Sequence, residues 1–269
     1  MTGTVIGDEY PTIERMSKLG LLVPKPILLE LDASILGGAF MIMTAIDADP
    51  AGTYFPKDRR RQPRKVSAQF ARDAAAQLAR LHRLTTVEIA DPESLAAARA
   101  EEVESAYRRW KSIAKPPNSV NVDLGFAWLK SHPLTKDRPR CLIHGDYGVH
   151  NMMARDGRLA GILDWELASE DDPAIDLAEC RMLMVEDTVP WEEFVAAYIA
   201  AGGDATACEE TAVTYFCVWS FTVKFGLMLC DARNAFVSGM RRDSLMASAA
   251  THSADRILHS LSRAMKMTL

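Results

Sequence analysis

The first third of the chain alternates between helix-like and strand-like hydrophobic patterns. Residues 8–20 have the pattern of a short helix, and residues 27–31 and 39–45 are apolar segments that favour strands. Residues 66–84 predict a longer helix, because apolar side chains recur on one of its faces at Val66, Phe70, Leu78 and Leu81. We therefore expect a small mixed α/β region followed by a helix.

The rest of the chain is mostly helical in its pattern, apart from residues 141–164. Asp91-Pro92-Glu93 predicts a helix start, because Asp caps the first amides, Pro suits the first turn and Glu favours the positive end of the helix dipole. Further helices are expected near Asp123, from residue 174 onwards and from Pro190. The longest apolar run, residues 215–230, is short for a membrane span and contains Lys224, so it predicts a buried core helix.

A short buried strand at residues 141–144 and a β-hairpin are predicted in the remaining segment. Asp156-Gly157 lies between two apolar runs, and a two-residue turn of this kind needs residues that accept a positive φ. Such a turn sets Asn151 opposite Ile162. Because side chains alternate between the two faces of a strand, Asp164 is expected on the same face as Asn151, roughly 7 Å away along the diagonal.

This arrangement predicts a metal-dependent reaction centre. An amide oxygen from Asn151 and a carboxylate from Asp164 suit Mg²⁺, which binds hard oxygen ligands. Asp146 lies in the turn that leads into the hairpin, next to this pair. A carboxylate beside an Asn/Asp metal pair is the layout of phosphoryl transfer, in which the first Asp receives the proton of the acceptor hydroxyl. We therefore predict Asp146 as the catalytic residue and Asn151 and Asp164 as metal ligands.

Two other interpretations of the same segment stay open. Asp146, Asn151 and Asp164 could be turn and capping residues without a chemical role. His144, Asp146 and His150 also have the H-x-D-x-x-x-H spacing of a zinc or iron site, although no further His or Glu cluster completes it. His150 is otherwise expected to be a loop residue near the phosphates or in solvent. The acidic residues that follow Asp164 could attract a cationic acceptor, but a solvated surface is the favoured interpretation for Glu166, Glu170, Asp171, Asp172 and Glu179.

Composition narrows the class of protein. The 269 residues suffice for one large or two modest domains, and a net charge of −5 argues against a general nucleic-acid surface. The basic run at residues 57–65 is expected to be a solvated loop, with a phosphate or coenzyme contact as the other option. Five dispersed cysteines without a C-x-x-C motif, and no signal peptide, predict a reduced cytoplasmic protein without a membrane partner.

Three motifs in order carry a resemblance to a known family. His144-Gly145-Asp146 followed by Asn151 gives H-G-D-x-x-x-x-N, residues 162–166 give I-L-D-W-E, and residues 172–177 give D-P-A-I-D-L. Together they resemble the aminoglycoside phosphotransferase and choline kinase superfamily. The segment from residue 23 to residue 43 resembles the kinase-like domains related to those fused to acyl-CoA dehydrogenases, which hints at a hydroxyacyl or similar acceptor.

The resemblance implies a fold, cofactors and further site residues. The fold would be α+β and protein-kinase-like, with a truncated N-terminal α/β lobe at residues 1–45 and a mostly helical C-terminal lobe at residues 46–269. The cofactors would be ATP and Mg²⁺, with Met43 and Ala45 in the hinge that contacts adenine. His144 would brace the catalytic loop, and Asp176 would hydrogen-bond its backbone. Glu9 would correspond to the helix glutamate that pairs with the nucleotide lysine.

The sequence departs from the family pattern at its start. The glycine-containing loop and the lysine that contact the phosphates in the family have no counterpart before Lys18, and residues 1–7 are too short to supply the strands that carry them. We expect an ATP- and Mg²⁺-dependent phosphotransferase that acts on a hydroxyl of a small molecule. The alternative is a catalytically impaired kinase-like binding or regulatory module. The sequence leaves the acceptor and the oligomeric state open.

Overall fold

The computed structural model describes residues 6–52, 66–84, 93–113, 115, 119–134, 138, 140–183, 189–241, 261–262 and 264–265. They group into two compact units, one formed by residues 1–87 and 140–205 and the other by residues 88–139 and 206–269. The basic run at residues 57–65 and the helix-starting pair Asp91-Pro92 lie outside the described residues. The lobe boundary expected at residue 45 stays a prediction.

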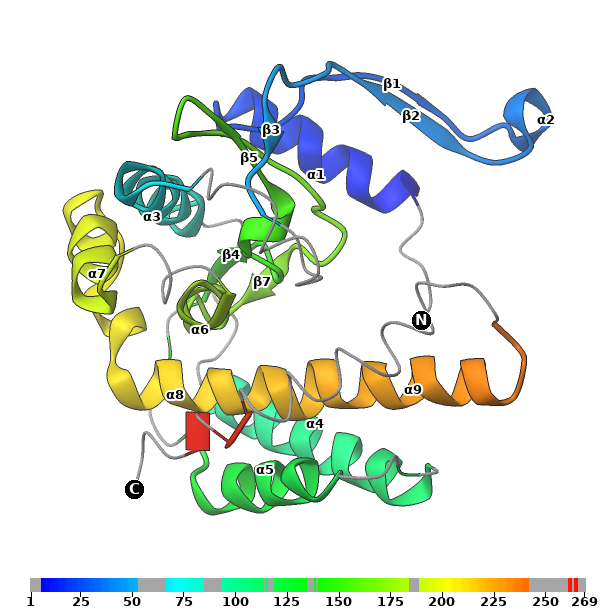
Figure 1. The fold of residues 1–269 in the computed structure, drawn as a ribbon, viewed down its shortest axis with the longest axis vertical. Helices are drawn as coiled ribbons and strands as arrows, with labels where there is room; N and C mark the ends of the chain where they lie inside the picture. The colour runs from blue at the N-terminus through cyan, green and yellow to red at the C-terminus, as the bar shows by residue number, and fades with distance from the viewer. Residues whose placement is uncertain are drawn as a thin grey trace. The chain divides into compact units, whose positions relative to one another are not determined.

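The first unit begins with a helix and a β-hairpin (Figure 1). Helix α1 spans Ile6–Lys18, and Gly20 follows it with φ 73°. Strands β1 (Pro26–Glu30) and β2 (Phe40–Met43) pair antiparallel. The predicted helix and both strands are confirmed, because each end lies within two residues of its expected position.

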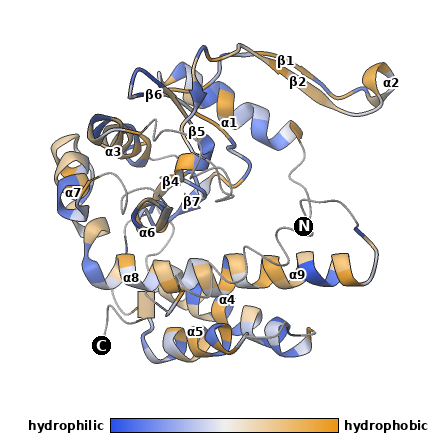
Figure 2. Ribbon diagram, in the orientation of Figure 1, coloured by the Kyte–Doolittle hydropathy of each residue, from blue (hydrophilic) through white to orange (hydrophobic). Residues whose placement is uncertain are grey.

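A short helix at the tip of this hairpin has no signal in the hydrophobic pattern. Helix α2 spans Ala33–Leu36, and its ends are set by local capping. The Asp32 side chain accepts a hydrogen bond from Ser34 N at 2.8 Å, and Gly37 closes the helix with φ 82°. Figure 2 shows the hairpin and α2 largely in the colours of apolar residues, although Leu36 is 71% exposed. Because α2 buries no residue, its formation leaves no helical period in the sequence.

The described residues of the first unit also form two small sheets and three further helices. One sheet has the order β3-β5-β6 and is formed by β3 (Asp49–Pro50), β5 (Met152–Arg155) and β6 (Arg158–Ile162). The other pairs β4 (Cys141–Ile143) with β7 (Ser169–Asp171). The helices are α3 (Ala68–His82), α6 (Ala174–Leu183) and α7 (Trp191–Ala200). Strand β4 was predicted, whereas β3 and β7 are too short and too polar to show a strand pattern.

Helix α3 supplies much of the core of this unit. Phe70, Leu78 and Leu81 are 0% exposed, as the predicted apolar face requires, and Val66 is half-buried ahead of the helix. Helix α3 packs against α7, whose Phe194 is also fully buried. Burying one such side chain stabilises a fold by roughly 1.5–3 kcal/mol. This packing fixes the last residues of α3, which lie close to the candidate site.

The predicted hairpin turn is confirmed, but its register is wrong by one residue. Asp156 and Gly157 have φ values of 53° and 74°, as the two-residue turn requires. A bulge after Met153 then shifts the pairing, so that Met152 rather than Asn151 lies opposite Ile162. A bulge places two residues against one, and a strict alternation of side chains does not anticipate it.

The bulge changes the setting of Asn151. This residue ends the 3₁₀ turn η2 (Val149–Asn151), just before β5. The Asn151 carbonyl accepts a hydrogen bond from Leu163 N at 2.8 Å. Leu163, the residue directly before Asp164, therefore lies opposite Asn151. Asp164 itself has φ 66° and so does not continue the alternation of β6.

The residues of the second unit that the structure describes are mostly helical. Its helices are α4 (Glu93–Ser112), α5 (Val120–Ser131), α8 (Glu210–Trp219) and α9 (Phe225–Val237), with a π-helical turn (Ser220–Lys224) between the last two and a 3₁₀ turn η4 (Ala205–Cys208) at the boundary of the units. The continuous helix Glu210–Val237 is long and apolar enough to cross a membrane, but 89% of its most apolar stretch is buried inside the protein. Such burial is typical of a core helix, as predicted for residues 215–230.

Candidate active site

The loop that carries Asp146 begins where β4 ends. Gly145 has φ 79°, and a Cβ atom at this position would lie 2.5 Å from the carbonyl oxygen of Leu167. Only glycine tolerates both the left-handed backbone and this close approach. The glycine of the H-G-D motif therefore makes the sharp turn that leads from the strand to Asp146.

Two buried carboxylates of α6 hold the backbone of this loop. Asp176 accepts hydrogen bonds from the backbone nitrogens of His144 and Gly145, each at 2.8 Å. Glu179, one helical turn later, accepts a hydrogen bond from Tyr147 N at 2.9 Å. Asp176 and Glu179 are both 0% exposed. Asp176 therefore makes the backbone contacts that the resemblance implied.

The expectation of a solvated surface is wrong for two of the acidic residues after Asp164. Glu179 is fully buried, and Asp172 is 3% exposed. Asp172 accepts a hydrogen bond from Ala174 N at 2.9 Å at the start of α6. Carboxylates are buried at little cost when backbone amides satisfy them, and these amide partners are not visible in a sequence.

His82 completes the surroundings of Asp176. His82 Nε2 lies 3.1 Å from Asp176 Oδ2, and His82 Nδ1 lies 2.9 Å from the Tyr198 hydroxyl oxygen. Burial alone would raise the pKa of Asp176, but the hydrogen bond and charge of His82, together with His144, outweigh it and hold the pKa below its ordinary value. Asp176 is therefore an ionised acceptor that links α3 and α6 to the loop.

His144 is locked to the backbone on both sides of its ring. Burial lowers the pKa of His144, so its neutral form is favoured. Nδ1 accepts a hydrogen bond from Asp146 N at 3.2 Å, and Nε2 donates to the Leu163 carbonyl at 3.0 Å. Neither nitrogen is left for a zinc ion. Among the residues that the structure describes, no group of three or more His, Cys, Asp or Glu side chains is arranged to hold a metal.

Asp146 and Asn151 are joined directly. Asn151 Nδ2 donates to both the carbonyl oxygen and the Oδ2 atom of Asp146, each at 3.0 Å. Asn151 is 7% exposed, so its amide is held firmly. Because the amide nitrogen is engaged by Asp146, the amide oxygen is the atom of Asn151 that can serve as a metal ligand.

Asp164 is an exposed carboxylate, and the residue before it, Leu163, donates its backbone N–H to the Asn151 carbonyl. The residue after Asp164, Trp165, is 1% exposed and donates its backbone N–H to Glu9 Oε1 at 3.2 Å, which anchors the segment on α1. Asn151 and Asp164 together offer an amide oxygen and a carboxylate, the hard donors that Mg²⁺ prefers. The chemistry of these two side chains suits a magnesium ion, which would fill its other positions with phosphate oxygens and water.

Glu9 faces two other carboxylates. Its partial burial raises its pKa, the Trp165 N–H lowers it, and the charges of Asp164 and Glu166 raise it again, so that the net shift is upwards. A cation placed beside Asp164 would relieve part of this repulsion. Glu9 thus contacts the segment that carries a predicted metal ligand, and the pairing with a nucleotide lysine stays a prediction.

Replacing Glu9 by Gln is expected to raise the melting temperature at pH 7 and to have less effect at pH 4. The folded-state pKa of Glu9 is raised above 4.5, so the stability that its protonated form provides is present below that pH and is lost as the pH rises through the folded pKa. Gln keeps an oxygen for Trp165 N without the charge. Thermal unfolding at both pH values measures the effect, with Glu14→Gln on the same helix as the control. An equal gain at both pH values would contradict the electrostatic explanation.

Met43 is the last residue of β2 and Ala45 follows that strand, whereas Asp146 lies in the loop after β4. Met43 ends β2 opposite Pro26, and the pairing continues through a hydrogen bond from Thr44 N to the Lys25 carbonyl at 2.9 Å. Met43 is half-buried and Ala45 is exposed. Their predicted contact with adenine stays a prediction.

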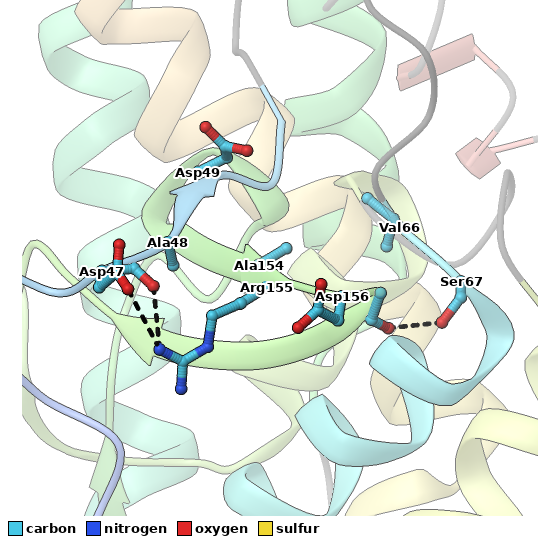
Figure 3. Close-up of a pocket in the computed structure, with 9 residues that line it drawn as sticks. Asp47, Ala48, Asp49, Val66, Ser67, Ala154, Arg155 and Asp156 are labelled. Carbon is cyan, nitrogen blue, oxygen red and sulfur yellow. Dashed lines mark hydrogen bonds and ion pairs between the residues drawn. The ribbon is translucent and has the colours of Figure 1, made fainter.

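A pocket of about 530 Å³ lies at the turn end of the β5–β6 hairpin (Figure 3). Arg155 Nη1 donates to the Asp47 carbonyl at 3.2 Å on one side, and Ser67 Oγ donates to the Gly157 carbonyl at 2.6 Å on the other. The predicted site residues are not among the described residues that line it. Asn151 precedes the opposite end of β5, so the pocket and the predicted reaction centre lie at different ends of one strand.

Three residues of the site were not assigned a role from the sequence. His150 was expected in a loop near the phosphates or in solvent, and its Nε2 lies 3.1 Å from Asp146 Oδ2, a contact that this expectation did not include. Glu179 accepts a hydrogen bond from the loop directly, whereas His82 contacts Asp176, which in turn holds the loop. The spacing of four residues between Asp146 and His150 is the one sequence signal that could have indicated a contact. The other two contacts join residues distant in sequence and need the fold.

Comparisons with known proteins identify the family of the chain. The model of the phosphotransferase enzyme family matches residues 6–212. Acyl-CoA dehydrogenase family member 11 of Rattus norvegicus is 25% identical over 186 residues, which cover 66% of this chain and 23% of that protein. The chain thus spans about a quarter of the length of such relatives.

Solved structures share the fold. A candidate aminoglycoside phosphotransferase from Ralstonia eutropha has a TM-score of 0.65 at 17% identity, covering 98% of this chain and 84% of that one. A choline/ethanolamine kinase family protein from Mesorhizobium loti has a TM-score of 0.60 at 17% identity, with coverages of 96% and 78%. Amicoumacin kinase hAmiN, solved with AMP-PNP, Ca²⁺ and Ami, has a TM-score of 0.59 at 16% identity, with coverages of 97% and 78%. The fold is the expected α+β kinase-like one, and the chain belongs to the phosphotransferase enzyme family.

Proposed function

We propose that this chain transfers the γ-phosphoryl group of ATP to a hydroxyl of a small molecule, with the help of Mg²⁺. The observation that carries the proposal is the hydrogen bond between Asn151 and Asp146 beside the segment that bears Asp164. Phosphoryl transfer depends mainly on positioning and on charge stabilisation, and one rigid loop and hairpin supplies the groups for both.

Each residue has a distinct role in this proposal. Asp146 touches the acceptor hydroxyl, orients it and receives its proton. The Asn151 amide oxygen and the Asp164 carboxylate hold Mg²⁺, which when bound supplies positive charge to the β- and γ-phosphates. Met43 and Ala45 contact adenine. His144, Asp176 and Glu9 hold the catalytic loop and the metal segment in place.

The fold neighbours and the composition support the cofactors and the cellular location. Amicoumacin kinase hAmiN, with the same fold, was solved with an ATP analogue and a divalent cation. Family membership supports a small acceptor, and the acyl-CoA dehydrogenase relatives favour testing hydroxyacyl compounds. We further propose a cytoplasmic enzyme, because five dispersed cysteines without a C-x-x-C motif are typical of a reducing compartment.

Calorimetry with ATP is expected to show binding that depends on magnesium and on Asp164. The wild-type chain should bind Mg-ATP measurably and bind ATP in EDTA at least about tenfold more weakly, since a magnesium ion would offset the repulsion between the phosphates and the Asp164 carboxylate. Asp164→Ala should lose this magnesium dependence, whereas Asp47→Asn, a change at an exposed carboxylate, should retain it. Absence of wild-type binding at millimolar ATP would favour the alternative, a kinase-like module without catalysis.

An acceptor screen follows from the same proposal. Transfer of ³²P from labelled ATP to choline, an aminoglycoside and a hydroxyacyl thioester would compare the acceptor types suggested by the relatives and neighbours. A labelled product with wild type and none with Asp164→Ala would support the proposed reaction.

A further inference from the structure

We infer that His150 is a positioning residue that fixes the carboxylate of Asp146 for catalysis. The inference rests on the proposed function, because it concerns the residue proposed to receive the acceptor proton. His150 Nε2 lies 3.1 Å from Asp146 Oδ2. A carboxylate oxygen accepts hydrogen bonds, so the ring nitrogen that faces it is the donor.

Two donors converge on the same oxygen of Asp146. Asn151 Nδ2 donates to Oδ2 at 3.0 Å, and His150 Nε2 reaches the same atom from the preceding residue. With two N–H groups on Oδ2, the carboxylate is held in place by the loop that carries both donors. A carboxylate held in one orientation can receive a proton without first rotating, which favours the reactive geometry.

The backbone around His150 is built to hold this contact. Residues 149–151 form the 3₁₀ turn η2, which brings His150 and Asn151 back towards Asp146. Gly148 N donates to the Asp146 carbonyl at 2.8 Å, and Asn151 N donates to the Gly148 carbonyl at 3.0 Å. Val149 lies so close to Gly52 that a Cβ there would come within 2.7 Å of it. The turn is therefore held by the packing of Val149 against Gly52 and by its own backbone hydrogen bonds.

The burial of the pair strengthens the interaction. The side chains of His150 and Asp146 are 13% and 20% exposed, respectively. A hydrogen bond to a charged group in such a site is stronger than one in water, and its loss costs correspondingly more. Oriented this way, His150 acts through Asp146 and does not need to contact the acceptor itself.

The first test is spectroscopic and needs no activity. In ¹⁵N-histidine-labelled protein, the His150 ring signals, identified by their loss in His150→Gln, should show a proton on Nε2 and should shift in Asp146→Ala. Signals that do not change in Asp146→Ala would overturn the inference. This measurement stands even if the chain transfers no phosphate, so it separates failure of the inference from failure of the proposed function.

The second test is kinetic and uses the acceptor found in the screen, or water as acceptor in slow ATP hydrolysis. His150→Ala should lower kcat about tenfold to a hundredfold with little change in KM for ATP, the range expected for one hydrogen bond to a charged group. His150→Gln, which keeps an N–H donor, should recover most of the loss. His132→Ala, the same change at an exposed histidine, should behave like wild type. A His150→Ala enzyme with unchanged kcat, or no recovery in a folded His150→Gln enzyme, would overturn the inference.

Discussion

Asp146→Asn should reduce kcat for phosphoryl transfer by roughly 10²–10⁴-fold, the usual contribution of a positioned acid–base group. Asn has nearly the shape of Asp and keeps an oxygen for the donors of His150 and Asn151, but it cannot receive the acceptor proton. Binding of Mg-ATP should therefore persist. Steady-state kinetics measures the first effect, and calorimetry measures the second.

A matched substitution shows whether the loss of activity comes from losing the proton acceptor or only from removing one negative charge. Asp47→Asn removes a carboxylate whose side chain is fully exposed, and its kcat should equal that of wild type. If Asp146→Asn kept more than about a tenth of wild-type kcat, its role as proton acceptor would be refuted. A parallel loss of Mg-ATP binding would instead indicate that Asp146 supports the metal pair.

Asp176→Ala should lower the free energy of unfolding of the first unit by roughly 3–5 kcal/mol, the cost of removing one partner from a buried charged network. The change leaves the amides of His144 and Gly145 and the ring of His82 without their shared acceptor. Denaturant unfolding followed by tryptophan fluorescence, to which the buried Trp165 contributes, would measure the loss. Transfer activity should fall with it, because the catalytic loop loses its anchor.

The stability that Asp176 contributes depends on pH in one direction. The folded-state pKa of Asp176 lies below the ordinary value of 3.8, so the stability it contributes is present above that pH and is lost as the pH falls through the folded pKa. The difference between wild type and Asp176→Ala should therefore be constant near neutrality and shrink in strong acid.

The control for Asp176→Ala is Asp156→Asn in the hairpin turn. Asp156 is exposed and has φ 53°, a conformation that Asn also tolerates, so the change should alter stability by less than about 0.5 kcal/mol. Comparable losses in both variants would show that Asp176 has no special structural role.

The local features of the fold could be predicted because they arise from neighbouring residues. Helix α3 follows from the apolar face that includes Phe70 and Leu81, and the hairpin turn follows from Asp156-Gly157. Strand β7 could not be predicted, because Ser169–Asp171 is short and polar and pairs with β4 only in the folded chain. The bulge next to Met153 was missed for a similar reason, since its cause lies in the pairing and not in the strand itself.

The sequence by itself determined the family pattern and the order of the chemical groups, from Asp146 to Asn151 to Asp164, because these are fixed by short spacings along the chain. The tertiary structure decided which side chains hold them. Asp176, Glu179 and His82 reach the loop from helices distant in sequence, and the turn at Val149 brings His150 onto Asp146. The physical reason is that a buried charge is stable only where folding supplies its partners, and a linear pattern does not record those partners.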